Sequence, residues 1–180
     1  RGHTIRLDME DSSVTSMTIN LAARLNKRFG NVGVAIQANL YRTHKDLELL
    51  LENNVSVRLV KGAYKEHEDS AYQTSDAIGG SFFNYAANLY SHESNSPAIA
   101  THDQGLLDDI EELIPKPEFF EYEFLYGIRR DIQEKFKNKG YKVRIYIPFG
   151  EDWMPYTMRR LKEWKNLVFV VKNIFKEWCK

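Results

Sequence analysis

The chain has 180 residues, of which 43% are apolar and 13% aromatic, enough to bury the core of one folded domain. Lys plus Arg and Asp plus Glu number 25 each, and this zero formal charge argues against a nucleic-acid or membrane-surface role driven by bulk charge. Cys179 is the only cysteine, which excludes an intramolecular disulfide and fits a reducing compartment, and the five histidines lack zinc-site spacing.

Short β-rich runs alternate with helical stretches along the chain. The pattern predicts strands over 3–8, 31–38, 56–64, 97–103, 119–125 and 142–150. Between and after them it predicts helices over 13–28, 44–53, 80–91, 104–113, a stretch ending near 138, a stretch through 156–164, and an amphipathic stripe over 167–178. Six βα units in a row imply a parallel sheet. No linker divides the chain, so we expect residues 1–180 to belong to one catalytic domain.

Two architectures fit this pattern, an open doubly wound sheet and a (β/α)₈ barrel of the TIM type. The chain has no GxGxxG turn after its first strands and no GxxxxGK[ST] loop, which disfavours nucleotide-loop versions of the open sheet. A complete barrel needs eight strands and about 250 residues. We therefore expect an α/β chain with a partial barrel that lacks its first one or two units.

Polar residues follow every predicted strand, where parallel barrels carry their functional side chains. Any single one has a local alternative, because an Asp there often caps a helix and a Thr-His-Asp run often makes a turn. Polar groups at all six ends together favour an enzyme or small-molecule site. The residues are Asp8, Gln37, Arg58, Lys61, Thr101, His102, Glu123 and Tyr146.

Two short motifs add to this face. In VKGAY (60–64), Gly62 and Ala63 are small enough for a flat ligand to approach the backbone, although a loop glycine is also common. In YTMRRLKE (156–163), Arg159 and Arg160 form a pair of guanidiniums able to bind a carboxylate or phosphate. The alternative is a solvated helix face with an Arg–Glu pair. Because the helix starts directly after the last strand, its first turns should lie near the barrel mouth.

The motifs resemble proline dehydrogenase, an FAD-dependent (β/α)₈ barrel family. The resemblance runs in order along the chain, through RLDMED, QANLYR, VRLVKGAY, ATHD, FEYEFLYGIR, RIYIPFG and YTMRRLKE. The tail NLVFVVKNIF (167–176) is more similar to the single-function branch than to the large bifunctional proteins. The resemblance implies that the six strands are strands three to eight of the barrel. The family's active-site lysine on an early strand has no counterpart here.

The resemblance also implies roles for particular residues at the substrate. Arg159 and Arg160 would hold the proline carboxylate, while Tyr146 and Tyr156 would shape the pocket and Leu125 would pack on the ring. The residues implied in catalysis are Asp8, in the polar network at the substrate end, Arg58, near the reactive flavin nitrogen, and Tyr146.

At the cofactor, the resemblance implies that the flavin is lined or contacted by Gln37, Arg58, Val60, Lys61, Gly62, Ala63, Thr101, His102 and Glu163. The implied reaction oxidises L-proline to Δ1-pyrroline-5-carboxylate and passes electrons to a quinone, with pyrroline-5-carboxylate dehydrogenase as a candidate partner. The family works at the bacterial cytoplasmic membrane face or in mitochondria. We accordingly expect a cytoplasmic chain with peripheral contact at the inner membrane face, or a mitochondrial one in a eukaryote.

Two other functions remain open from the sequence. One is a flavin-independent barrel enzyme that acts on a carboxylated or phosphorylated metabolite and uses the same arginine pair. The other is a non-catalytic assembly module, in which the incomplete barrel pairs with a partner chain.

Overall fold

The computed structural model describes residues 2–92, 96–114 and 120–150 of the chain. Its sheet has six strands, each parallel to its neighbours and arranged in chain order. The strands are β1 (Ile5–Leu7), β2 (Val32–Gln37), β3 (Ser56–Val60), β4 (Ala98–Ala100), β5 (Glu121–Leu125) and β6 (Lys142–Tyr146). The parallel sheet predicted from the βα alternation is therefore confirmed.

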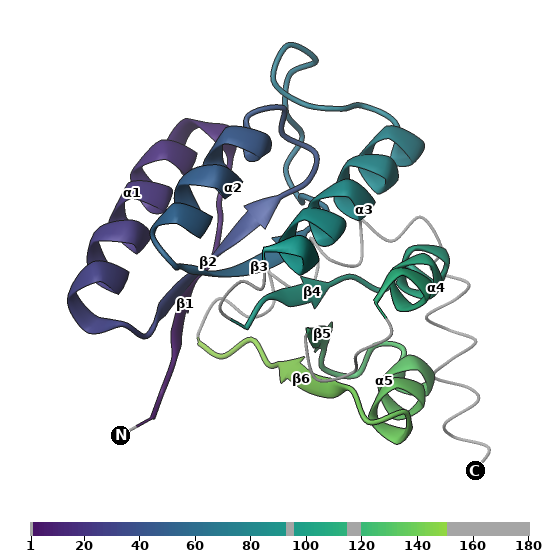
Figure 1. The fold of residues 1–180 in the computed structure, drawn as a ribbon. Helices are drawn as coiled ribbons and strands as arrows, with labels where there is room; N and C mark the ends of the chain where they lie inside the picture. The colour runs from purple at the N-terminus through teal and green to yellow at the C-terminus, as the bar shows by residue number, and fades with distance from the viewer. Residues whose placement is uncertain (1, 93–95, 115–119, 151–180) are drawn as a thin grey trace.

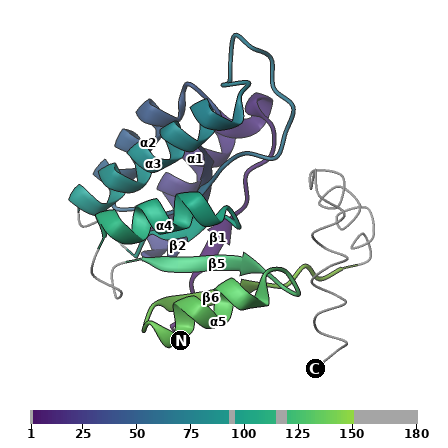
Figure 2. The ribbon, with the colours of Figure 1, turned by 90° about the vertical axis from the view of Figure 1, so that its right-hand side faces the viewer.

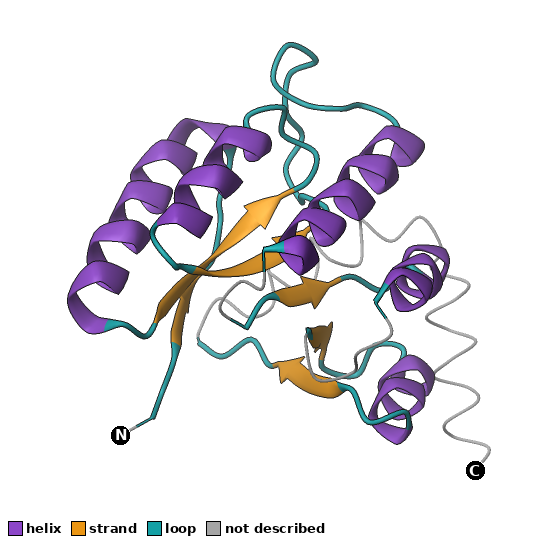
Figure 3. Cartoon of the chain, viewed as in Figure 1, coloured by secondary structure: helices purple, strands orange, loops and turns teal. Residues whose placement is uncertain are grey.

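Helices connect the strands and cover one face of the sheet. They are α1 (Ser12–Phe29), α2 (Thr43–Glu52), α3 (Ser75–Ser91), α4 (Gln104–Leu113) and α5 (Arg130–Asn138). Figure 1 shows the sheet bent into an arc with these helices around its outside. The side view in Figure 2 shows α5 beside β6, and Figure 3 separates strands from helices by colour. The described part of the chain is a half-barrel.

Residues of each strand alternate between the helix-facing and the inner face. On β3, Val57 and Leu59 are fully buried, whereas Arg58 and Val60 between them line the inner face. The apolar face of the sheet packs with the helices into one core. Its largest fully buried side chains include Tyr122, Phe82, Phe124, Phe136, Ile36, Leu47, Leu59 and Ile99. The inner face carries polar side chains such as Gln37, Arg58 and Glu123 together with smaller apolar ones.

Short polar residues fix where the helices begin. Asp11, Thr74 and Asp103 each accept a hydrogen bond from a backbone N–H of the first helical turn, in α1, α3 and α4 respectively. Gly30 ends α1 in the left-handed conformation, with φ of 70°. Because the caps of α1 and α4 follow directly after strands, the strand ends and the helix starts form one rim.

Three predicted boundaries differ from the structure by four or five residues. The strand predicted over 56–64 ends at Val60, because Gly62 turns the chain with φ of 111°. The strand predicted over 142–150 ends at Tyr146, before Pro148. The helix predicted from residue 80 begins at Ser75, because Thr74 caps it and its two glycines lie inside the helix. The helices predicted over 156–164 and 167–178 lie outside the described residues.

Candidate active site

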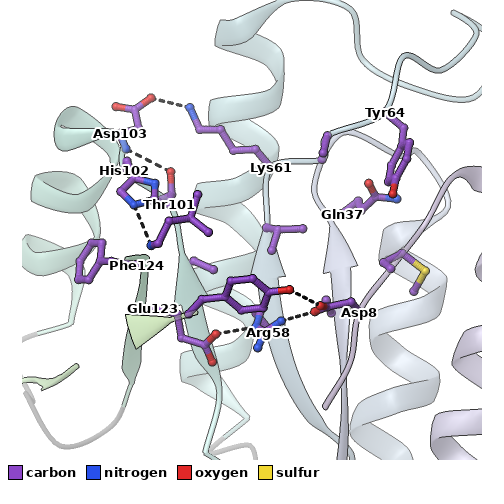
Figure 4. Close-up of a pocket in the computed structure, with 18 of the residues that line it drawn as sticks. Asp8, Gln37, Arg58, Lys61, Tyr64, Thr101, His102, Asp103, Glu123 and Phe124 are labelled. Carbon is purple, nitrogen blue, oxygen red and sulfur yellow. Dashed lines mark hydrogen bonds and ion pairs between the residues drawn. The ribbon is translucent and has the colours of Figure 1, made fainter. Parts of the chain in front are cut away.

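A pocket of about 550 Å³ opens at the carboxyl ends of the strands. Figure 4 shows its labelled polar side chains converging from the strands and the loops after them. Every site residue predicted within the described part of the chain lines it: Asp8, Gln37, Arg58, Val60, Lys61, Gly62, Ala63, Thr101, His102, Leu125 and Tyr146. The volume lies in the range of small-molecule and cofactor sites. The pocket therefore brings the sequence-predicted residues together.

The floor of the pocket is a buried ionic cluster. Arg58 on β3 forms an ion pair with Asp8, and its Nε lies 2.6 Å from Glu123 Oε2. Tyr146 donates a hydrogen bond to Asp8 Oδ2 at 3.1 Å, and the Arg58 guanidinium lies 5.6 Å from the centre of the Tyr146 ring. These contacts connect β1, β3, β5 and β6 across the inner face (Figure 4). They hold the Arg58 guanidinium in a fixed position.

Glu123 has a second cationic partner, Arg6 on β1. Burial raises the pKa of the Glu123 carboxyl above its usual value, against the attraction of Arg58 and Arg6. Burial likewise lowers the pKa of Arg6, although Glu123 opposes that shift. Both side chains are thus desolvated, and their mutual ion pair compensates the cost.

A lysine and an aspartate meet at the opposite side of the pocket. Lys61 Nζ donates to Asp103 Oδ2 at 2.5 Å, which links the loop after β3 to the start of α4. Burial alone would raise the pKa of Asp103, but the hydrogen bond from Lys61 helps bring it below the usual value. Asp103 N–H also donates to Thr101 Oγ1 at 3.2 Å. This side of the pocket therefore carries the Lys61 ammonium group close to the Thr101 hydroxyl and the Asp103 backbone N–H.

His102 lies on the same rim in its neutral form. Its Nε2 accepts a hydrogen bond from the backbone N–H of Leu125 at 3.1 Å, so the proton of the neutral ring lies on Nδ1. Burial, together with the charge of Arg129, lowers the pKa of His102 to about 4. The ring therefore acts near neutral pH as an uncharged support of the Leu125 backbone.

The loop after β3 packs closely on the loop after β2. A Cβ atom at Gly62 would lie 2.1 Å from Asn39 Oδ1, so only glycine fits there. Gln37 donates from Nε2 to the backbone oxygen of Glu10 at 2.9 Å, and Tyr64 hydrogen-bonds the Glu10 carboxylate. Three residues with small apolar side chains, Ala35, Ala63 and Ala100, also line the pocket.

Sequence reasoning gave no role to several lining residues, namely Met9, Glu10, Ala35, Tyr64, Ala100, Asp103 and Phe124, and it named Glu123 as a strand-end polar residue without a specific role. Alternation along the strands would have found Ala35, which lies two residues from Gln37. The same alternation places Arg6 on the face of Asp8. Nothing in the sequence signals the bond between Tyr64 and Glu10.

The predicted residues Tyr156, Arg159, Arg160 and Glu163 lie outside the described residues. Within residues 2–92, 96–114 and 120–150, no group of three or more His, Cys, Asp or Glu side chains could hold a metal ion. In the same ranges, no helix has the length and apolar character needed to cross a membrane.

The model of the proline dehydrogenase family matches residues 1–171. Proline dehydrogenase 1 of Bacillus subtilis is 35% identical over 179 residues, which cover 96% of this chain and 59% of that protein. Proline dehydrogenase of Deinococcus radiodurans is 36% identical over 184 residues, covering 97% of this chain and 58% of that protein. The chain thus spans about three fifths of the length of these relatives.

Solved structures agree with this match. Proline utilization A from Bdellovibrio bacteriovorus, inactivated by N-propargylglycine, superposes with a TM-score of 0.83 at 26% identity, over 93% of this chain and 20% of that one. Proline utilization A from Corynebacterium freiburgense, at 22% identity and a TM-score of 0.76 over 97% of this chain and 22% of that one, shows the same fold. Sequence, half-barrel and pocket together establish that the chain belongs to the proline dehydrogenase family.

Proposed function

We propose that the chain is the substrate- and flavin-binding part of an FAD-dependent proline dehydrogenase, which oxidises L-proline to Δ1-pyrroline-5-carboxylate. One observation carries this proposal: every predicted site residue in the described ranges lines a single pocket of a chain that belongs to the family. The six strands would be strands three to eight of a closed (β/α)₈ barrel, with residues 1–180 in one domain.

The pocket suits a flavin by its chemistry. The small side chains of Ala35, Ala63 and Ala100 would leave room for a planar ring system, and the polar side chains that line the same pocket offer hydrogen-bond donors. Gln37, Arg58 and residues 60–63 would hold the ring, and Thr101 and His102 the chain beyond it. Bound FAD would supply the two-electron acceptor for the reaction. A cation such as Arg58 in a partly buried site favours the negative charge that develops there.

The substrate would lie on the inner face beside Tyr146 and Leu125. Arg159 and Arg160 would bind its carboxylate through their forked donors, and this orients the carbon next to the ring nitrogen. Proline would lose a hydride from the ring carbon beside the nitrogen that does not bear the carboxylate, and a proton from the nitrogen, so that a C=N double bond forms and the two electrons go to the acceptor that bound FAD would supply. Asp8 and Tyr146, hydrogen-bonded to each other at 3.1 Å, would order this end of the site.

Electrons would leave to a quinone, and pyrroline-5-carboxylate dehydrogenase would consume the product. With these partners, the protein would act in the cytoplasm, in peripheral contact with the inner face of the membrane, or in the mitochondrion of a eukaryote. The balanced charge of the chain supports no nucleic-acid role.

The proposal is tested with the purified intact protein, supplied with FAD, L-proline and a dye acceptor. We expect dye reduction with formation of Δ1-pyrroline-5-carboxylate, and a loss of about 10²-fold or more in kcat for Arg58→Met. Arg144→Met is the matched control, because Arg144 pairs with Glu121 at 2.7 Å and does not line the pocket. A protein that binds no FAD, or that turns over a carboxylated metabolite without it, would contradict the proposal.

A further inference from the structure

Glu123 is the most buried charged side chain of the site. Its side chain is 2% exposed, on the inner face of β5, between arginines from β3 and β1. A carboxylate removed this far from water is stable as an ion only beside cations. Arg58 and Arg6, on either side of Glu123, are these cations.

Arg58 is shared between two carboxylates that differ in their exposure. The Asp8 side chain is 52% exposed at the pocket, whereas Glu123 lies behind the guanidinium, away from solvent. Solvent screens the charge of Asp8, but it screens that of Glu123 much less. Glu123 therefore contributes more to the electrostatic potential that Arg58 projects into the pocket.

Arg6 competes for the same carboxylate. It forms an ion pair with Glu123, donates to Ser56 Oγ at 3.1 Å and lies 3.7 Å from Glu121. With Glu123 ionised, the two buried cations are partly neutralised. Without that charge, Arg58 would keep only Asp8 as a carboxylate partner among the described residues, and Arg6 would keep only Glu121, at 3.7 Å.

We propose that Glu123 is a positioning residue for Arg58, and that it lowers the reduction potential of the bound flavin by neutralising part of the arginine's charge. This inference rests on the proposed flavin-dependent function. Reduced flavin carries more negative charge than oxidised flavin, so a stronger positive field favours reduction. Removing the Glu123 charge should therefore shift the potential to a more positive value.

Glu121 offers a matched control on the same strand and the same face. It lies two residues before Glu123, pairs with Arg144 at 2.7 Å, and lines the opposite end of the sheet and not the pocket. Glu121→Gln thus removes the same charge from the same strand without freeing Arg58. If the loss of any carboxylate charge from β5 were enough to shift the potential, Glu121→Gln and Glu123→Gln would behave alike.

The test is the flavin reduction potential of the intact FAD-loaded protein, measured for wild type, Glu123→Gln, Glu123→Asp and Glu121→Gln. We expect a positive shift in Glu123→Gln, a smaller one in Glu123→Asp, which keeps the charge at a shorter reach, and the wild-type value in Glu121→Gln. If Glu123→Gln does not fold, the Asp variant against the Glu121 control decides the question.

The inference would be overturned if the Glu123 variants had the same potential as the Glu121→Gln control, or if their potential shifted to a more negative value. Either result would leave the proposed function standing, because the wild type would still be an active flavoprotein. A wild-type protein that stays colourless with added FAD would overturn the proposed function and this inference with it.

Discussion

His102 is a buried histidine whose ring supports the backbone of the neighbouring strand. Its Nε2 accepts from Leu125 N–H at 3.1 Å, and a protonated ring would lose that acceptor. Its pKa of about 4 lies below the model-peptide value of 6.5, so the folded state binds its proton less tightly than the unfolded chain. The stabilisation from the neutral ring is thus present above about pH 6.5 and lost as the pH falls toward about 4.

This shift predicts a specific acid sensitivity. Between about pH 7 and about pH 5, the free energy of unfolding should fall by about 2 kcal/mol more in the wild type than in His102→Gln. Urea unfolding of the intact protein at the two pH values measures the difference. His44→Gln, which removes an exposed histidine of α2, is the matched variant. Parallel pH dependence in wild type and His102→Gln would show that His102 is not the group responsible.

The loop between β3 and α3 depends on one glycine. Gly62 has φ of 111°, and a Cβ atom there would lie 2.1 Å from Asn39 Oδ1. Asn39 is itself 5% exposed and donates its backbone N–H to Lys61 O at 2.9 Å, so it has little room to move. The close approach of the two loops therefore fixes the backbone that carries Lys61 and Ala63 into the pocket.

Gly62→Ala should lower the free energy of unfolding by about 1–3 kcal/mol and weaken FAD retention, because the backbone must leave this conformation. Gly79→Ala provides the comparison. Gly79 lies inside α3 with nothing within 4 Å of an added Cβ, so the substitution should raise stability by about 0.5–1 kcal/mol. Chemical denaturation and the flavin content after gel filtration give both readouts. Equal stability of the two variants would refute the argument.

The six strands could be predicted in order from the sequence. Each faces a helix layer on one side and a polar interior on the other, and apolar alternation marks such strands. Strand ends were harder to predict. The predicted strand runs on to Tyr64, but the chain turns after Val60 because of the conformation of Gly62. The start of α3 was placed too late because two glycines interrupt its sequence, although Thr74 caps the helix from outside.

The whole molecule brings the ends of all six strands to one pocket. This is why residues far apart in sequence could be assigned to one site before the fold was known: parallel strands align their carboxyl ends. The pairing of side chains across the barrel could not be predicted from the sequence in this way. Glu123 was recognised as polar, but its place between Arg58 and Arg6 depends on the curvature that brings β1 opposite β5.

The same curvature relates the two outer strands of the described sheet. β1 and β6 have no hydrogen-bonded neighbour on their outer sides in the described ranges, yet Tyr146 of β6 reaches Asp8 after β1 at 3.1 Å. The hydrogen bond between Tyr146 and Asp8 thus links the two outer strands, whose backbones do not pair in the described ranges. This link lies at the pocket that we propose for flavin and proline.

The most direct test of the central claim is an anaerobic titration of the intact FAD-loaded protein with L-proline, followed by the visible flavin spectrum. The account predicts that L-proline bleaches the flavin absorbance while Δ1-pyrroline-5-carboxylate forms in equal amount. A flavin spectrum that stays oxidised in excess L-proline would contradict it.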